Sequence, residues 1–387
     1  GQYLAFWSAV HGHLRHGHEA RGWGAAAGGR RQAAGGRRQA AGGRRQAAGG
    51  RRQEGSTEMS ADDSEQLLSD ALAGVSGPWN AADYWFEPVA EGTMATIWRG
   101  VSPSSQSPDV AVRLTPKPVS LISRIAELVD GVAGVECPQT LAVGTVETGT
   151  GPQTVHVCTW IGKGGADRRD PYGLGQDLAR LHSELARPDA GDFTDRRLTF
   201  EPGPVPSPDQ ELPHWYVAQH LWRDRILPCL AEDLASLRPQ PIHGDLHWDN
   251  VVAGRGGGFG FIDFDKVMYA PPVFDLAKLL ATGFFVLQGE QARYQQSRAV
   301  DLLAGYRSIR PLDEAEMAAI EGFVVILTGE IARLGYAYDV PAYQTQANAL
   351  GAWWTARRRQ RPQDPLGLRE QNDTLAPQRL SLPDHDN

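Results

Sequence analysis

The sequence predicts an α+β protein of two unequal lobes, a small β-rich lobe followed by a larger and mainly helical one. Segments of β-branched and aromatic residues are concentrated between residues 84 and 161, where one helical pattern interrupts them. Beyond Gly162 apolar residues recur mostly at helical spacing. The length of 387 residues suits two such lobes, and a cleft between them is a natural place for a ligand.

Residues 1–58 differ from the rest in composition and are expected to lie outside the folded body. From Ala26 to Gln53 the unit AAGGRRQ is repeated four times without a large apolar side chain, so we expect disorder. Three interpretations compete: a basic arm for nucleic acid, an organelle transit peptide, and a tandem duplication in GC-rich DNA. We expect translation to start at Met59, or the residues before it to be dispensable, because MSADDSEQLLSDAL reads like a natural N-terminus.

Residues 59–80 are predicted to hold a short helix, and residues 81–161 to form the small lobe. The helix has an acidic first turn and is stopped by SGPW. A further helical pattern, SLISRIAELVDGVAGV, follows the third strand of the lobe. The strands are predicted at 84–90, 96–101, 109–115, 140–147 and 154–161.

Residues 162–360 are predicted to form the large lobe, and the Pro-rich, polar residues 361–387 a mobile tail. The first predicted helix of the large lobe begins at an Asp-Pro pair, and the second is kinked or split at Pro228. Two short strands flank a GRGGG turn. The helical patterns lie at 170–185, at 213–237 and in several segments from about 272 to 356.

Charge, hydropathy and cysteine content narrow the function classes. Residues 1–58 hold ten Arg and three Glu, whereas the whole chain carries −8, so residues 59–387 carry −15. An acidic body argues against a nucleic-acid partner and is compatible with a cationic substrate. No apolar stretch approaches the ~20 residues that a membrane-spanning helix needs, so no membrane association is expected. Three widely spaced cysteines predict buried free thiols in the cytoplasm.

The stretch HGDLHWDN, residues 243–250, carries the main chemical signal. Asp245 and Asn250 stand five residues apart, the spacing of a kinase catalytic loop, and Asp263 follows the apolar strand FGFI. Phosphoryl transfer needs oxygen ligands for Mg²⁺, a carboxylate that orients the attacking hydroxyl, and a cation on the phosphates. Asp245 is expected to accept a hydrogen bond from the substrate hydroxyl, and Asn250 to offer its amide oxygen to Mg²⁺.

Arg113 is the predicted phosphate cation. It ends the strand DVAVR, at the place of the lysine in the V-A-I-K strand of kinases, and its planar fork suits phosphate. Glu127 is the only acid on the next helix before Asp130, so we expect it to hold Arg113 by an ion pair. The loop AEGTMAT offers Gly92 and Thr93 to the phosphates, although it has no G-x-G-x-x-G pattern.

Several motifs together resemble the aminoglycoside phosphotransferase and choline kinase-like family. They are HGDLHWDN, FIDFD, PPVFDLAKLL, DLARLHSEL and VAVRL, and the resemblance covers roughly residues 84 to 355. It implies a protein-kinase-like bilobal fold, with a small antiparallel sheet and one helix in the N-lobe and a larger helical C-lobe. It also implies ATP and Mg²⁺ as cofactors. The chain departs from the family pattern in its phosphate loop, and it has Arg in place of the common Lys.

The same resemblance implies individual roles. Asp245 is the catalytic residue, and Asn250 and Asp263 hold Mg²⁺. Asp265 is a supporting residue, and Asp275 resembles the structural Asp that braces the catalytic loop. The remaining implied positions are in the hinge VCTWIG, where the backbone of Cys158 and of Trp160 faces adenine.

His243 and His247 raise the alternative of a zinc site. They are four residues apart, but Gly244 lies between them, no HExxH pattern exists and no third soft ligand is near in sequence. Structural roles for both histidines are therefore preferred, with His243 supporting the catalytic loop.

The predicted function is an ATP-dependent phosphotransferase that acts on a hydroxyl group of a small molecule, as a monomer or homodimer. Aminoglycoside-like antibiotics, amino alcohols and sugars are the expected acceptors. The alternative is a non-catalytic, nucleotide-binding regulatory module of the same fold. A protein kinase is disfavoured because DFDKVMYAPPVFD leaves no room for an activation loop and a peptide platform.

Overall fold

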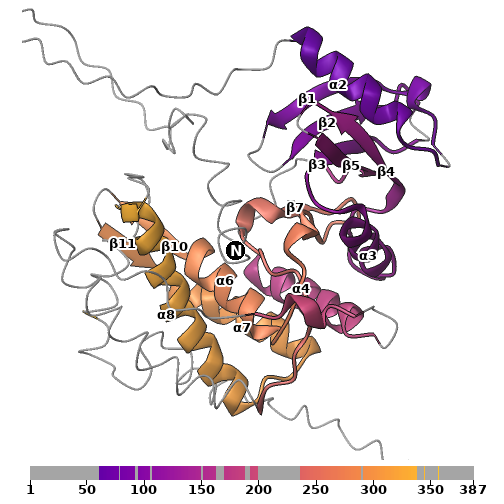
Figure 1. Cartoon of the computed structure of the whole chain (residues 1–387). Coiled ribbons are helices and arrows are strands. Elements are labelled where there is room, and N and C mark those ends of the chain that lie inside the picture. Colours follow the sequence, from indigo (N-terminus) through magenta and orange to yellow (C-terminus); the bar gives the residue numbers. More distant parts are fainter. Residues whose placement is uncertain are drawn as a thin grey trace, which may run out of the picture.

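The chain forms two lobes, an indigo to purple N-lobe and a C-lobe whose colours run from magenta through orange to golden yellow in Figure 1. The N-lobe is a β-sheet with two helices, whereas the C-lobe is mainly helical, which confirms the predicted division. The computed structural model describes residues 61–77, 79–91, 95–104, 107–149, 151–162, 170–187, 192–198, 236–288 and 291–337, together with residues 344 and 356.

The N-lobe sheet has five strands in the order β1-β2-β3-β5-β4, and every neighbouring pair is antiparallel. All five predicted strands are confirmed, with ends shifted by up to three residues. A short 3-10 turn, η1 (Ala81–Asp83), precedes them. The strands are β1 (Trp85–Glu91), β2 (Thr96–Val101), β3 (Val110–Thr115), β4 (Thr140–Thr148) and β5 (Gly151–Thr159).

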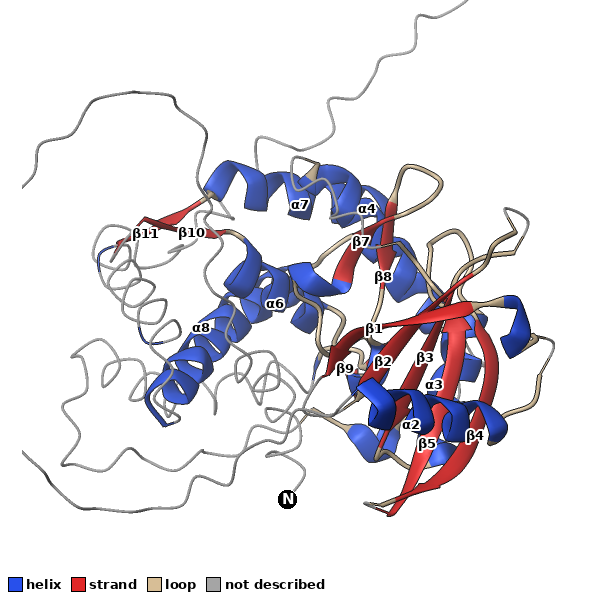
Figure 2. Cartoon of the chain, turned by 90° about the horizontal axis from the view of Figure 1, so that it is seen from above, coloured by secondary structure: helices blue, strands red, loops and turns tan. Residues whose placement is uncertain are grey.

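The two faces of this sheet contact different parts of the molecule. Helix α2 (Ala61–Ala73) lies across one face (Figure 2), where its leucines pack on a buried apolar cluster. That cluster takes Val112 and Leu114 from β3. Because side chains alternate along a strand, Arg113 points to the opposite face. The sheet therefore presents its cation away from α2.

Helix α3 (Val119–Asp130) joins the lobes on that opposite face. It packs along β4 and β5, and its buried Ile125, Leu128 and Val129 belong to the main hydrophobic cluster of the C-lobe. The lobe boundary is thus bridged by apolar packing as well as by polar contacts.

Four helices build the described part of the C-lobe: α4 (Pro171–Leu185), α6 (Val273–Gly283), α7 (Gln296–Ile309) and α8 (Glu314–Ala337). Asp170 caps α4, accepting a bond from the Gly173 N–H at 2.8 Å, and Pro171 occupies the first turn as predicted. The 3-10 turn η2 (Thr194–Arg196) follows α4. The helix predicted over 213–237 lies almost wholly outside the described residues.

Short antiparallel pairs hold the functional segments. Strand β6 (Gln240–Ile242) pairs with β9 (Met268–Ala270), and β7 (Val251–Ala253) pairs with β8 (Phe259–Phe261). The 243–250 loop, which ends in the 3-10 turn η3 (Trp248–Asn250), therefore runs from β6 to β7. The 263–266 turn, which contains the 3-10 turn η4 (Phe264–Lys266), follows β8.

The prediction of helical segments alone beyond residue 272 is wrong in one place. An antiparallel hairpin of β10 (Phe285–Gln288) and β11 (Gln291–Tyr294) separates α6 from α7. The sequence FFVLQGEQARY contains its signal, because strand-forming residues flank a two-residue connection that includes glycine. The helical segments predicted from about residue 272 onward therefore include residues that form two strands.

Two composition-based expectations can be compared with the structure. Cys137 and Cys158 are buried free thiols, while Cys229 lies outside the described residues. Burial raises the pKa of the Cys158 thiol to about 12, which suits an inert strand residue. Among the described helices, none combines the length and the apolar character needed to cross a bilayer.

Candidate active site

The backbone of the 243–250 loop is held by one carboxylate of α6. Asp275 is fully buried and accepts the N–H groups of His243 and Gly244, both at 2.9 Å. Gly244 has a φ of 78°, and a Cβ there would lie 2.2 Å from the carbonyl oxygen of Lys266. Only glycine fits this left-handed, crowded position. Asp275 therefore lies where the resemblance to known kinases implies a brace.

A buried histidine completes this brace. The His182 Nε2 lies 3.2 Å from Asp275, and its Nδ1 lies 2.8 Å from the Tyr306 hydroxyl. Complete burial lowers the pKa of His182, against the opposing effect of Asp275, so the ring is neutral near pH 7. Helices α4, α6 and α7 are thereby tied to the start of the loop.

The His243 ring links the loop to the strand that precedes Asp263. It donates from Nε2 to the Ile262 carbonyl at 2.9 Å and accepts the Asp245 N–H at Nδ1, at 3.3 Å. The ring also packs on Phe264, with 4.6 Å between centroids. His247 faces Asn250 instead, with 3.2 Å between Nε2 and the amide nitrogen. The two rings have different hydrogen-bond partners, which favours a structural role for each histidine over zinc binding.

Asp245 is buried between two lysines, and each carboxylate oxygen is ion-paired. The Lys266 ammonium lies 2.7 Å from Oδ2, and the Lys278 ammonium contacts Oδ1. Burial alone would raise the pKa of Asp245, but the charges of Lys278 and Lys266 outweigh it and hold that pKa well below its usual range. Asp245 is therefore an ionised acceptor of hydrogen bonds and a weak base.

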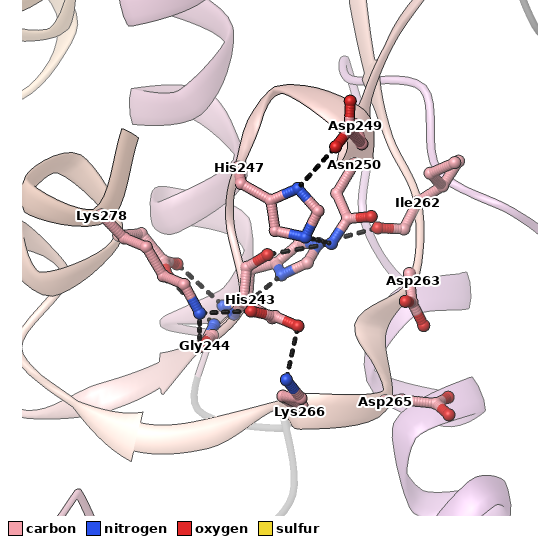
Figure 3. A network of polar contacts seen from close by, with 12 residues as sticks. His243, Gly244, His247, Asp249, Asn250, Ile262, Asp263, Asp265, Lys266 and Lys278 are labelled. Atoms are coloured by element: carbon pink, nitrogen blue, oxygen red, sulfur yellow. Dashed lines mark hydrogen bonds and ion pairs between the residues drawn. The ribbon is translucent and has the colours of Figure 1, made fainter. Parts of the chain in front are cut away.

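Asn250 is buried beside Asp245 and is oriented by its amide nitrogen. Its Nδ2 donates to the backbone carbonyl of Asp245 at 2.9 Å. The amide oxygen is thereby turned away from Asp245, toward the side of Ile262 and Asp263 (Figure 3). This orientation leaves an oxygen donor on the side of Asp263.

Asp263 is the only non-glycine residue with a positive φ in the described part of the chain, at 64°. Such a backbone conformation costs about 1 kcal/mol for a residue other than glycine and is often found at functional sites. The side chain is 46% exposed, in contrast to buried Asp245. Its carboxylate is therefore accessible to a ligand.

Arg113 of β3 crosses from the N-lobe to the 263–266 turn. Its guanidinium binds Asp265 through two nitrogens, at 2.8 and 2.9 Å, and lies 3.2 Å from Asp263. The predicted ion pair with Glu127 is wrong: that side chain is exposed on α3 and is not among the carboxylates that contact Arg113. The buried Nε of Arg113 has no hydrogen-bond partner among the described residues.

Asp265 receives a second cation from the N-lobe. The Lys117 ammonium lies 3.0 Å from its carboxylate and 2.9 Å from its carbonyl oxygen. Burial would raise the pKa of Asp265, but Arg113 and Lys117 outweigh it and lower that pKa. Asp265 therefore joins the turn after β8 to the N-lobe, a supporting position as predicted.

The remaining predicted nucleotide-binding residues are only partly described. Gly92 and Thr93 lie outside the described residues. Cys158 is buried in β5, between β3 and β4. The N–H of Trp160 donates to the Asp109 carbonyl at 2.7 Å, so this donor is already used within the protein. The Trp160 ring lies under Arg99, at 5.4 Å.

Sequence reasoning missed the lysines that contact the aspartates of this site. Lys266 and Lys278 bind Asp245, and Lys117 binds Asp265. A signal existed for Lys278, because it is the only cation in the largely apolar helix VFDLAKLLATG. A charged residue in such a helix is almost never buried without a partner.

Comparison with known proteins places these motifs in a family. The sequence profile of the phosphotransferase enzyme family matches residues 106–312, more than half of the chain. A homoserine kinase of Phenylobacterium zucineum (strain HLK1) is 36% identical over 109 residues, which are 25% of this chain and 33% of that protein. A homoserine kinase of Gluconobacter oxydans (strain 621H) is 36% identical over 86 residues, 22% of this chain and 26% of that protein. The chain thus covers a third or less of these relatives.

Solved structures share the fold over most of the chain. An amicoumacin kinase in complex with AMP-PNP, Ca²⁺ and Ami has a TM-score of 0.52 and 15% identity, over 73% of this chain and 93% of that one. A choline/ethanolamine kinase family protein from Mesorhizobium loti has a TM-score of 0.51 and 17% identity, over 78% of this chain and 97% of that one. These similarities confirm the protein-kinase-like bilobal fold.

Proposed function

Because the chain belongs to the phosphotransferase enzyme family, we propose that it transfers the γ-phosphoryl group of ATP to a hydroxyl group of a small molecule. The observation that carries this proposal is the meeting of the two lobes at Asp263. Arg113 of the N-lobe sheet lies 3.2 Å from this exposed carboxylate, and buried Asp245 and Asn250 belong to the neighbouring loop. A cation for phosphates, oxygen donors for a metal and an orienting carboxylate are the parts that phosphoryl transfer needs.

Arg113 is the residue that we assign to the phosphates. Its guanidinium is fixed by Asp265, and its buried Nε donor has no partner among the described residues. A buried donor without a hydrogen bond costs about 1–3 kcal/mol, so a ligand oxygen that accepts from it gains this energy back. The planar fork matches phosphate oxygens better than an ammonium does.

Asn250 and Asp263 are the residues that we assign to Mg²⁺. The Asn250 amide oxygen is turned from Asp245 toward the side of Asp263, whose carboxylate is partly exposed, and both offer the hard oxygen ligands that this ion prefers. Within the described ranges no group of three or more His, Cys, Asp or Glu side chains forms a metal site. A small ligand set suits an ion that relies on nucleotide phosphates and water for its other ligands. The ion, when bound, shields negative charge on the phosphates.

Asp245 is the residue that we assign to the acceptor. Its carboxylate stays ionised, so it accepts a hydrogen bond from the acceptor hydroxyl and directs that oxygen to the phosphoryl group. Because its pKa is low, its main contribution is orientation rather than early removal of the proton. The hydroxyl proton is expected to pass to the Asp245 carboxylate late, when the bond to phosphorus is largely formed and ADP is leaving.

The acceptor is expected to be an aminoglycoside-like antibiotic, an amino alcohol, a sugar or a related hydroxylated metabolite. Homoserine and choline or ethanolamine enter this set because proteins named for these substrates are similar to the chain. The specificity of such folds depends on local side chains, so the acceptor must be found by screening.

The proposal is tested by ADP release from ATP and Mg²⁺ with a panel of homoserine, choline, ethanolamine, aminoglycosides and amicoumacin. We expect one acceptor class to raise ADP release well above the acceptor-free rate, and Asp245→Asn to lower this increase about 10³-fold. The substitution keeps the size of the side chain and removes its charge. Full turnover in Asp245→Asn contradicts the role of Asp245, and ATP binding without any turnover favours the regulatory module.

A further inference from the structure

The carboxylate of Asp245 is constrained on both oxygens. Lys266 contacts Oδ2 at 2.7 Å, and Lys278 contacts Oδ1. The side chains of Asp245, Lys266 and Lys278 are only 8%, 8% and 5% exposed. Placing three charges in the protein interior carries a large desolvation cost, and a packed apolar cluster is often as stable. This cluster is thus a costly way to hold one side chain, which points to a role beyond stability.

The two lysines come from different parts of the C-lobe. Lys278 stands three residues after Asp275 on α6, so both side chains lie on the same side of the helix. Asp275 holds the backbone of the loop at His243 and Gly244, while Lys278 holds the side chain of Asp245. One helix therefore fixes both the path of the loop and the carboxylate that it carries.

Lys266 belongs to the 263–266 turn, directly after Asp265. Asp265 faces Arg113 and Lys117 of the N-lobe, whereas Lys266 faces Asp245. The same short turn thus holds the accessible Asp263, the contact to the N-lobe and the second tether of Asp245. A displacement of this turn would therefore also displace the carboxylate of Asp245.

We propose that Lys278 and Lys266 are positioning residues of the proposed phosphotransferase, which hold the two oxygens of Asp245 so that its carboxylate plane cannot rotate. The terminal torsion of aspartate has a broad, two-fold preference, so a single contact leaves the plane free to swing. A carboxylate has about four lone-pair sites, and one bond to each oxygen leaves sites of fixed direction for the acceptor hydroxyl. The inference rests on the function proposed above.

The competing explanation is direct contact of either ammonium with the phosphates or the acceptor. The two explanations differ in a double-mutant cycle with Asp245→Asn. If Lys278 acts through Asp245, Lys278→Met has little further effect once the carboxylate is gone. If Lys278 touches the reacting groups itself, the two losses multiply.

The test measures steady-state and single-turnover rates with ATP, Mg²⁺ and the acceptor found for the wild type. Lys278→Met and Lys266→Met are each expected to lower kcat about 10²-fold, the effect of a misplaced catalytic group, with the KM for ATP changed less than about 3-fold. Lys278→Arg is expected to recover part of the lost kcat, because it keeps the charge. In the Asp245→Asn background, Lys278→Met is expected to lower the remaining rate less than about 3-fold.

Controls separate positioning from general damage. Arg187→Met removes a cation that pairs with Glu184 at 3.4 Å outside this cluster, and it is expected to leave kcat unchanged. If Lys278→Met does not fold, the Lys278→Arg variant and the double variant, in which the loss of one positive charge is matched by the loss of one negative charge, carry the comparison.

Two outcomes overturn the proposal: Lys278→Met with full kcat, or multiplied losses in the double variant. A wild-type protein that releases no ADP with any acceptor overturns the proposed function instead, so the two failures are distinguishable.

Discussion

The 243–250 loop and the 263–266 turn are neighbours that are held in different ways. The loop is tied within the C-lobe alone, by Asp275 and Lys278 of α6 and by Lys266. The turn is tied across the lobes, because its Asp265 binds Arg113 and Lys117 of the N-lobe.

This difference separates two duties of the proposed site. A loop fixed mainly within one lobe holds the proposed acceptor-side carboxylate from α6, and only its Lys266 tether lies in the turn that contacts the N-lobe. A turn fixed from both lobes makes the nucleotide side depend on how the lobes meet. Substitutions of Asp245 and of the lysines that hold it should therefore affect turnover, and substitutions of Arg113, Asp263 and Asn250 should affect nucleotide and metal binding.

The largest expected effect is that of Asp245→Asn. Loss of the orienting carboxylate is expected to lower acceptor-dependent kcat by about 10³-fold, within the range known for a catalytic acid or base. The Kd for ATP with Mg²⁺ is expected to change less than about 3-fold, because Asp245 is not among the proposed contacts to the nucleotide and the metal. Calorimetry and ADP release measure the two quantities, and a large rise in Kd breaks the proposed separation.

Arg113→Met is expected to have the opposite signature. It removes the proposed phosphate cation, which pairs with both Asp263 and Asp265, and leaves Lys117 at Asp265, so kcat/KM for ATP is expected to fall about 10²-fold. The KM for the acceptor is expected to stay close to the wild-type value. The matched substitution Glu127→Met tests the ion pair with Arg113 that the sequence predicted and the structure does not contain. It is expected to leave the kinetics unchanged, and kinetics like those of Arg113→Met would show that the two residues are linked.

Asn250→Ala is expected to act through the metal. Because its amide oxygen is the proposed ligand, the Mg²⁺ concentration for half-maximal turnover is expected to rise about 10-fold, with kcat partly restored at high Mg²⁺. An unchanged Mg²⁺ requirement contradicts the ligand role. A Mg²⁺ titration at saturating ATP measures it.

The smallest effect concerns stability against pH. Partial burial, together with Arg113, lowers the pKa of His156 from 6.5 to about 4, and burial also lowers the pKa of His182. Both pKa values are depressed by folding, so their contribution to stability is present above pH 6.5 and is lost as pH falls toward 4. Each such histidine changes the free energy of unfolding by up to ~1.4 kcal/mol per pH unit.

Thermal unfolding between pH 7 and pH 4 measures this effect. His156→Gln is expected to flatten the decline without changing stability much at pH 7. If thermal stability falls as steeply between pH 7 and pH 4 in the variant as in the wild type, His156 does not contribute to this pH dependence.

Much of the fold was predictable because its signals are local. Alternation in DVAVRLT and the helical spacing of DPYGLGQDLARLHSEL correspond to β3 and α4. The hairpin of β10 and β11 was missed because a short apolar run beside a helix fits either type of element. Its two-residue connection was the better evidence.

The site was predictable where spacing within one segment decides it. Asp245 and Asn250 share a loop, and Asp275 lies in the first turn of α6. The partner of Arg113 was not predictable in this way, because Asp265 stands 152 residues away while exposed Glu127 is close in sequence. Partners across lobes depend on how two elements pack, which periodicity within one element does not reveal.

The 263–266 turn, the 243–250 loop and Arg113 together form the proposed site for ATP with Mg²⁺. Isothermal titration calorimetry of the full chain with ATP, with and without Mg²⁺, tests it most directly. The account predicts binding that is strengthened by Mg²⁺, weakened in Arg113→Met and retained in Asp245→Asn. No binding of ATP with Mg²⁺ to the folded protein, or binding that is unchanged in Arg113→Met, would contradict it.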